Sequence, residues 1–133
     1  MVCLTLSGCS TDPQAPAPLA VRGTMDLSGW DFQRQGPVKL DGEWEFYWGR
    51  LEVPEPAGGL PDDYFQVPGL WRGRTAKGVA LSAHGCGLYR LRVRLKPGQR
   101  AESLLVSGVL SVCRVWVDRA PLAASGIPGT SPM

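Results

Sequence analysis

An aromatic segment at Leu27–Trp48, LSGWDFQRQGPVKLDGEWEFYW, constrains the fold more than any other part of this chain. Over its last six residues, three large aromatic side chains alternate with two glutamates and a tyrosine. Successive side chains of a strand point to opposite faces, so this alternation predicts a β-strand. The core face of that strand is expected to carry Trp44, Phe46 and Trp48.

A hairpin or a bulged strand pair is predicted around this strand. Asp41-Gly42 is a turn signal that separates Glu43–Trp48 from the short run Val38–Leu40. The chain also has 17 glycines and 12 prolines at a hydrophobic share of 44%. Disordered chains are poor in hydrophobic residues, so these breakers indicate short strands and tight turns. We expect a single all-β core in a chain of 133 residues.

The clearest strand signal after the aromatic segment is Leu88–Leu95, in which apolar residues alternate with Arg90, Arg92 and Arg94. Period two over eight residues predicts a strand with a solvated arginine face. The turn Asp118–Pro121 is expected between two later strands. The remaining predicted strands are Tyr64–Val67, Ser103–Ser107, Val112–Asp118 and Leu122–Ala124.

The first 25 residues are interpreted as a leader and linker, and residues 26–133 as the folded domain. Leu6–Cys9 resembles the lipobox of bacterial lipoproteins, in which Cys9 would become the acylated N-terminus. The Pro/Ala-rich segment Ser10–Ala20 would then be a flexible tether. No lysine or arginine precedes Cys9, so an uncleaved, truncated leader is the alternative.

Charge and cysteine content exclude some functions. A net charge of +2 from 14 basic and 12 acidic residues is too small to indicate a nucleic-acid-binding surface. No C-x-x-C spacing occurs and His84 is the single histidine, so no zinc site is expected. No cofactor is predicted. Cys86 and Cys113 could pair outside the cytoplasm, or Cys113 could be an ordinary buried thiol.

Three groups of motifs occur in a fixed order. They are Gly29–Phe32 with Leu40–Trp48, then Val67–Trp71, then Gly87–Val93 with Val115–Asp118. Over about residues 27–130 they resemble the N-terminal extracytoplasmic domain of bacterial seven-transmembrane receptors with diverse intracellular signalling modules. In looser form the motifs are similar to those of the sugar-binding domain of glycoside hydrolase family two. Asp118-Arg119 differs from the Asn-Gly that is usual in the family.

The resemblance implies a galactose-binding-like jelly-roll β-sandwich. The implied function is a non-catalytic sensory or ligand-binding module of a membrane signalling receptor, periplasmic or at the cell surface and membrane-associated. The alternative is a sugar-binding accessory domain of a glycoside hydrolase. Further strands follow in the family, so the chain is interpreted as a fragment without its C-terminal strands, with an unpaired sheet edge.

The candidate ligand is a carbohydrate, and the candidate contacts are Trp71, Arg72, His84 and Arg90. A tryptophan on a loop can stack on a sugar ring, while arginine and histidine can bind its polar groups. Two structural alternatives stay open: the aromatic side chains could fill the core, and the arginines could form an ordinary solvated strand face.

No catalytic residues are assigned. Glycoside hydrolysis needs two carboxylates across a cleft, whereas Glu43 and Glu45 are expected on one solvent face, about 7 Å apart by strand rise. Cys86 and His84 could pair as nucleophile and base, but no third group is placed to orient them. The chain is therefore not expected to be an enzyme.

Overall fold

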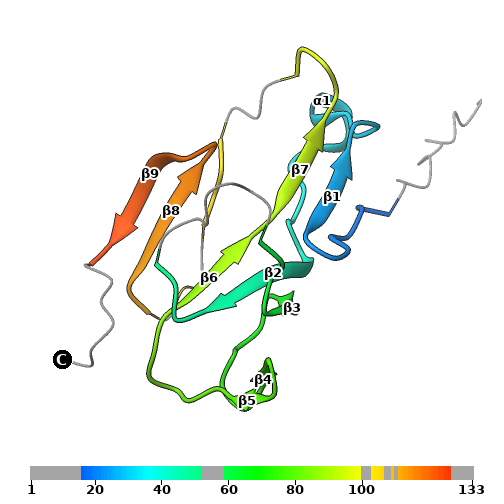
Figure 1. Cartoon of the computed structure of the whole chain (residues 1–133). Helices are drawn as coiled ribbons and strands as arrows, with labels where there is room; N and C mark the ends of the chain where they lie inside the picture. Colours follow the sequence, from blue (N-terminus) through cyan, green and yellow to red (C-terminus); the bar gives the residue numbers. More distant parts are fainter. Residues whose placement is uncertain (1–15, 52–58, 100–102, 107–108, 110, 127–133) are drawn as a thin grey trace, which may run out of the picture.

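The structure, a computed structural model, describes residues 16–51, 59–99, 103–106, 109 and 111–126 (Figure 1). In these ranges a four-residue helix accompanies a series of short strands. The elements are β1 (Thr24–Leu27), α1 (Phe32–Gln35), β2 (Gly42–Trp48), β3 (Asp63–Val67), β4 (Thr75–Ala76), β5 (Val79–Ala80), β6 (Gly87–Arg90), β7 (Arg92–Leu95), β8 (Cys113–Val117) and β9 (Ala120–Ser125). The predicted all-β class is confirmed, as several small sheets.

The central sheet has the strand order β3-β2-β6, and both neighbours of β2 are antiparallel to it. The predicted strands Glu43–Trp48 and Tyr64–Val67 are therefore confirmed, as β2 and β3. In this register Phe46 lies opposite Asp63 of β3 and Tyr89 of β6. Residues directly opposite one another share a face, so β6 places Tyr89 on the face of β2 that carries Phe46.

The predicted hairpin between Val38–Leu40 and β2 is wrong, since residues 38–40 form no strand. The backbone of Ala20 lies beside Gly42 instead. Its N–H donates to the Asp41 carbonyl and its carbonyl accepts from the Glu43 N–H, both at 2.8 Å. A Cβ on Gly42 would lie 2.4 Å from the Ala20 carbonyl oxygen, so this close approach requires glycine.

The predicted strand Leu88–Leu95 changes partner in its middle. Its first part, β6, pairs antiparallel with β2, and its second part, β7, pairs parallel with β1. Leu91, between the two parts, belongs to neither strand. Figure 1 shows β6 and β7 following one another toward different neighbours. This segment therefore joins the central sheet to the sheet that contains β1.

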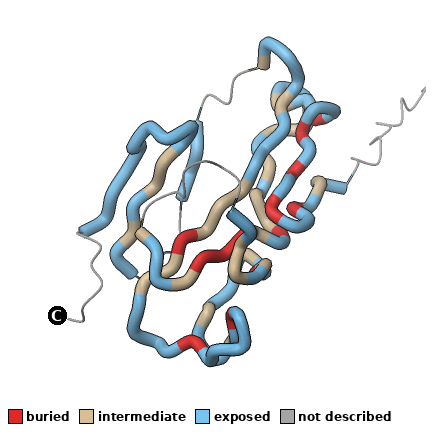
Figure 2. The backbone as a smooth tube through the Cα atoms, in the orientation of Figure 1, coloured by how far each residue is buried: buried red, intermediate tan, exposed pale blue. Residues whose placement is uncertain are grey.

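Two hydrophobic clusters form the core. One surrounds Met25 and Leu27 of β1 and includes Ala20, and the other surrounds Phe46 and Phe65 of the central sheet. Figure 2 shows buried residues along β1, along β2 and β6, and near the β4–β5 hairpin. Ala20 is 2% exposed, so the packed core includes a residue that precedes the predicted start of the domain.

β8 and β9 form a hairpin that pairs with no other strand in the described ranges. The predicted strands Val112–Asp118 and Leu122–Ala124 are confirmed, the second being longer than expected. Their two-residue connection has φ 49° at Asp118 and φ 68° at Arg119, and type I′ turns require positive φ at both positions. The tight turn thus forms without the usual glycine. The strand predicted at Ser103–Ser107 is wrong for 103–106, which form none.

Candidate functional site

An aromatic cluster covers one face of the central sheet. At its centre Phe46 and Phe65 are buried and stacked, with ring centroids 4.3 Å apart. Around them lie Trp48, Trp71 and Tyr89, with centroids 6.3, 6.2 and 4.9 Å from Phe46. These three outer side chains are only partly buried, and we call them the aromatic surface.

Trp71 begins a tight turn after β3. The N–H of Arg74 donates to the Trp71 carbonyl at 3.0 Å, and Gly73 has φ +79° at the third position, as type II turns require. The turn leaves Arg72 exposed at its corner. It returns Arg74 to the sheet, where the guanidinium carbon lies 5.0 Å from the centroid of the Phe65 ring.

Trp71 combines the two roles that the sequence left open. Its ring packs on the cluster, with centroids 5.9 Å from Trp48 in an edge-to-face contact and 6.4 Å from Tyr89 in a stacked one. It nevertheless remains partly exposed. Trp71 therefore helps to close the core and also presents part of its ring to solvent.

The loop between β5 and β6 brings His84 to the same end of the sheet. The adjacent Gly85 lies on the Trp48 ring, where a Cβ would be 2.4 Å from an indole carbon. Ser82 Oγ donates a hydrogen bond to the His84 carbonyl oxygen within the loop. The His84 residue is exposed. Of the four predicted contacts, Arg72 follows Trp71 within its turn, and His84 lies in the loop whose Gly85 packs on the Trp48 ring.

Arg90 lies on the opposite face of the central sheet. Its neighbour Tyr89 faces the aromatic cluster, and successive side chains of a strand alternate between faces. The Arg90 guanidinium pairs with Glu45 at an Nε–Oε2 distance of 2.5 Å and lies over the ring of Tyr47, 5.3 Å from its centroid. Burial lowers the pKa of Arg90. The hydrogen bond to Glu45 and the charge of Glu45 raise it by more, so the pKa lies above its usual range.

The prediction that Glu45 lies on a solvent face of β2 is wrong, because the residue is only 5% exposed. Its second carboxylate oxygen accepts from Arg92 at 3.2 Å, so arginines from β6 and from β7 bind one carboxylate. The expected solvated arginine face is accordingly wrong for Arg90, whose side chain is 14% exposed. Glu43, two residues before Glu45, is exposed as expected.

Two titratable groups at the aromatic surface have shifted pKa values. Burial raises the pKa of Asp62, but the ion pair with Lys77, at 2.7 Å, and the hydrogen bond from the Trp48 N–H, at 2.8 Å, lower it more, so it lies below its usual value. Burial raises the pKa of the Tyr89 phenol, and the Arg74 guanidinium offsets only part of this effect. The Asp62–Lys77 pair links the turn of the β4–β5 hairpin to the residue that precedes β3.

Sequence reasoning did not single out Tyr89 or Arg74 as site residues. The alternation in Leu88–Leu95 places Tyr89 on an inward face, but its contact with Phe46 depends on the register between β6 and β2. The available signal for Arg74 was the glycine in Trp71-Arg72-Gly73-Arg74, which is typical of a tight turn.

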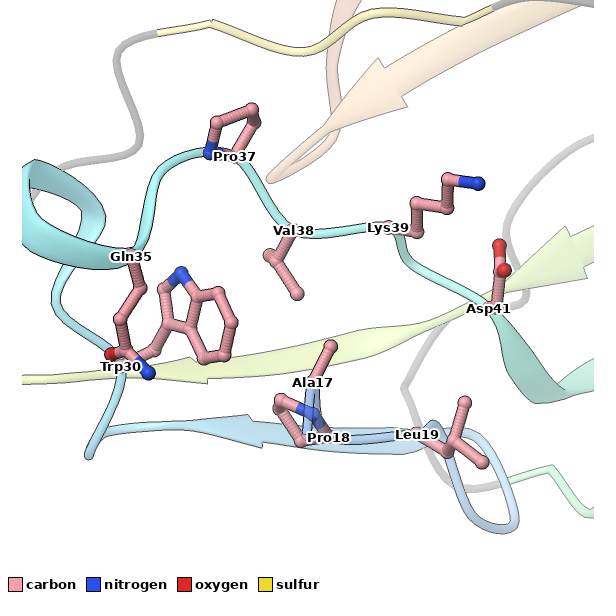
Figure 3. Close-up of a pocket in the computed structure, with 9 residues that line it drawn as sticks. All are labelled: Ala17, Pro18, Leu19, Trp30, Gln35, Pro37, Val38, Lys39 and Asp41. Atoms are coloured by element: carbon pink, nitrogen blue, oxygen red, sulfur yellow. The ribbon is translucent and has the colours of Figure 1, made fainter. Parts of the chain in front are cut away.

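A separate open cavity of about 400 Å³ lies beside the other core cluster (Figure 3). Its lining residues are Ala17, Pro18, Leu19, Trp30, Gln35, Pro37, Val38, Lys39 and Asp41. Trp30 offers little free surface, since the residue is 9% exposed and its indole N–H donates to the Gly36 carbonyl. None of the predicted ligand contacts lines this cavity.

The remaining sequence-based expectations concern the cysteines, a metal site and membrane-spanning segments. Cys86 and Cys113 are free thiols, so the disulfide alternative is not realised. The described residues contain no group of three or more His, Cys, Asp or Glu side chains that could hold a metal ion. In the same ranges no helix is long and apolar enough to span a membrane. Cys9 lies outside the described residues.

Comparison with known proteins identifies no family. No protein-family model, curated protein or solved structure matches the chain. The aromatic surface and the side chains around it are therefore the basis for a functional assignment.

Proposed function

We propose that this chain is a non-catalytic carbohydrate-binding domain with a jelly-roll fold, located on the extracytoplasmic side of a bacterial membrane signalling receptor. The ordered motifs Leu40–Trp48, Val67–Trp71 and Gly87–Val93 support the receptor assignment. Membrane attachment would come through an acyl group on Cys9 or through the rest of the receptor. The observation that carries the binding proposal is the partly exposed aromatic surface.

Carbohydrate is the ligand class that suits this surface. One face of a sugar ring presents C–H groups that pack on an aromatic ring, while its hydroxyl groups need polar partners at the edge. Trp71 and Tyr89 supply adjacent, nearly parallel rings, with 23° between their planes. The proposed polar partners are Arg72, which follows Trp71 in its turn, and His84, which lies in the neighbouring loop.

A non-catalytic role is consistent with the carboxylates. Glu45 is bound by Arg90 and Arg92 beneath the opposite face of the sheet, and Glu43 is exposed on the same strand. They do not face one another across a cleft, as the two carboxylates of a glycosidase do.

Titration calorimetry of the 133-residue chain against a panel of neutral and acidic oligosaccharides tests the proposal. Trp71→Ala should weaken binding by about two- to tenfold or more, since an aromatic contact contributes on the order of 0.5–1.5 kcal/mol beyond the burial of its surface. Trp116→Ala, which removes a partly buried tryptophan from β8, is the matched control and should leave the affinity unchanged. A thermal melt of each variant verifies folding. If Trp71→Ala and the unaltered chain bind the oligosaccharide with equal affinity, the proposal is wrong.

A further inference from the structure

The charges of the chain are unevenly distributed. Every Asp, Glu, Lys or Arg residue between Tyr64 and Ala101 is basic. These residues are Arg72, Arg74, Lys77, Arg90, Arg92, Arg94, Lys96 and Arg100. Both loops that flank the aromatic surface fall in this segment, so neither loop carries an acidic side chain.

Several of these cations are engaged with acidic residues from elsewhere in the chain. Arg90 and Arg92 bind Glu45, and Lys77 binds Asp62. Arg94 lies 4.0 Å from Asp26 in an exposed pair. The positive charges of Arg90, Arg92 and Arg94 are therefore paired with carboxylates, and they are not assigned to the aromatic surface.

Arg72 and Arg74 differ from this group. Neither forms an ion pair with any acidic side chain in the described ranges. Arg72 is exposed next to Trp71, while Arg74 lies over Phe65 and close enough to Tyr89 to influence its pKa. In the part of the chain that the structure describes, this turn therefore carries two arginines without a carboxylate partner, directly after Trp71.

Guanidinium groups suit a particular class of ligand. The planar N–H fork of arginine matches a carboxylate and binds it through two parallel hydrogen bonds. Two such groups on one turn can balance one or two negative charges, whereas a polyanion such as nucleic acid needs a longer cationic track.

Building on the carbohydrate-binding function proposed above, we infer that the ligand is an acidic sugar whose carboxylate is bound by Arg72 and Arg74 while its ring packs on Trp71. The arginines then determine specificity between acidic and neutral sugars, and the aromatic rings contribute affinity for both. Because Arg72 is exposed at the corner of a turn, its replacement should not disturb the fold.

The test compares trigalacturonate with its fully methyl-esterified form by calorimetry on the 133-residue chain. The ester keeps the sugar rings and removes the charges, so we expect trigalacturonate to bind about tenfold more tightly. Arg72→Gln should reduce this preference to about threefold or less, because it weakens binding of the charged acid more than binding of the ester. Arg94→Gln, an equal charge change on β7, should leave both affinities unchanged. Added salt should weaken binding of the acid more than of the ester.

Each contrary outcome has a distinct meaning. Equal binding of acid and ester overturns the acidic-sugar inference but preserves carbohydrate binding. If neither trigalacturonate, its ester nor any oligosaccharide of the panel binds, both proposals fail. If Arg72→Gln keeps the full preference for trigalacturonate over its ester, the carboxylate is not bound at this turn. If a ten-nucleotide oligothymidylate binds more tightly than trigalacturonate, the site is a nucleic-acid site instead. The comparison of acid with ester needs no variant, so it stands even if a substitution affects folding.

Discussion

Glu45→Gln removes a negative charge that arginines from two sheets share. The carboxylate receives Arg90 from β6 at 2.5 Å, Arg92 from β7 at 3.2 Å and the Tyr47 hydroxyl at 3.2 Å. The glutamate also packs against Gly23, where a Cβ would lie 2.4 Å from Glu45 Cγ. The substitution keeps the size of the side chain and leaves the two arginines without their counter-charge.

The expected loss follows from how far each arginine is buried. Removing one partner of a buried ion pair costs about 3–5 kcal/mol, whereas an exposed pair contributes about 0–1 kcal/mol. Arg90 belongs near the first case, with its side chain 14% exposed, and Arg92, at 50%, near the second. The glutamine oxygen still accepts one hydrogen bond, so we expect a loss of about 2–4 kcal/mol in the free energy of unfolding.

Glu43→Gln is the matched control. Glu43 is exposed on the same strand, and its carboxylate accepts the Arg22 N–H at 3.1 Å, a bond that an amide oxygen can also accept. This variant should change stability by no more than about 0.5 kcal/mol. Urea unfolding followed by tryptophan fluorescence compares the midpoints of the two variants at similar m-values. Equal losses in Glu43→Gln and Glu45→Gln would refute the role of the buried carboxylate.

Two further predictions concern the β8–β9 turn and the β4–β5 hairpin. Arg119 has φ 68°, a conformation that costs a non-glycine residue about 1 kcal/mol, so Arg119→Gly should slow amide hydrogen exchange in β8 and β9 but not in β2. Faster exchange in the hairpin would contradict this. The folded-state pKa of Asp62 lies below its ordinary value of 3.8, so its ionisation stabilises the fold above that pH, and this stabilisation is lost as the pH falls through the lower folded-state pKa. Urea midpoints of Asp62→Asn should therefore fall less steeply with acidification than those of the unaltered chain, and parallel curves would disprove the assignment.

Local alternation predicted the strands, because it depends only on neighbouring residues. Glu43–Trp48 alternates between large aromatic side chains and glutamate or tyrosine, and it forms a strand close to the predicted bounds. Strand partners depend on contacts distant in sequence, which alternation does not encode. Leu88–Leu95 therefore reads as one strand, although the structure divides it between two sheets at Leu91. Val38–Leu40 failed as a hairpin strand for the same reason, since Ala20 occupies the position beside Gly42.

Alternation also assigns side chains to two faces without saying which face is covered. Glu45 was expected in solvent because it lies on the face of β2 opposite the alternating aromatic side chains. Arginines and packed backbone nevertheless cover that face. The candidate site was predicted in part. Trp71 and Arg72 are adjacent in sequence and stay together, whereas Arg90 faces the other way because it follows the inward-facing Tyr89.

The most direct test of the carbohydrate-binding claim is an NMR titration of the indole N–H signals with trigalacturonate. The signals of Trp71 and Trp48 should shift, because their rings form the aromatic surface. Those of Trp30 and Trp44 should stay fixed, because their N–H groups are bonded to the Gly36 and Leu40 carbonyls away from it, at 3.0 and 2.8 Å. Shifts confined to Trp30, beside the other cavity, or no shift at all would contradict the account.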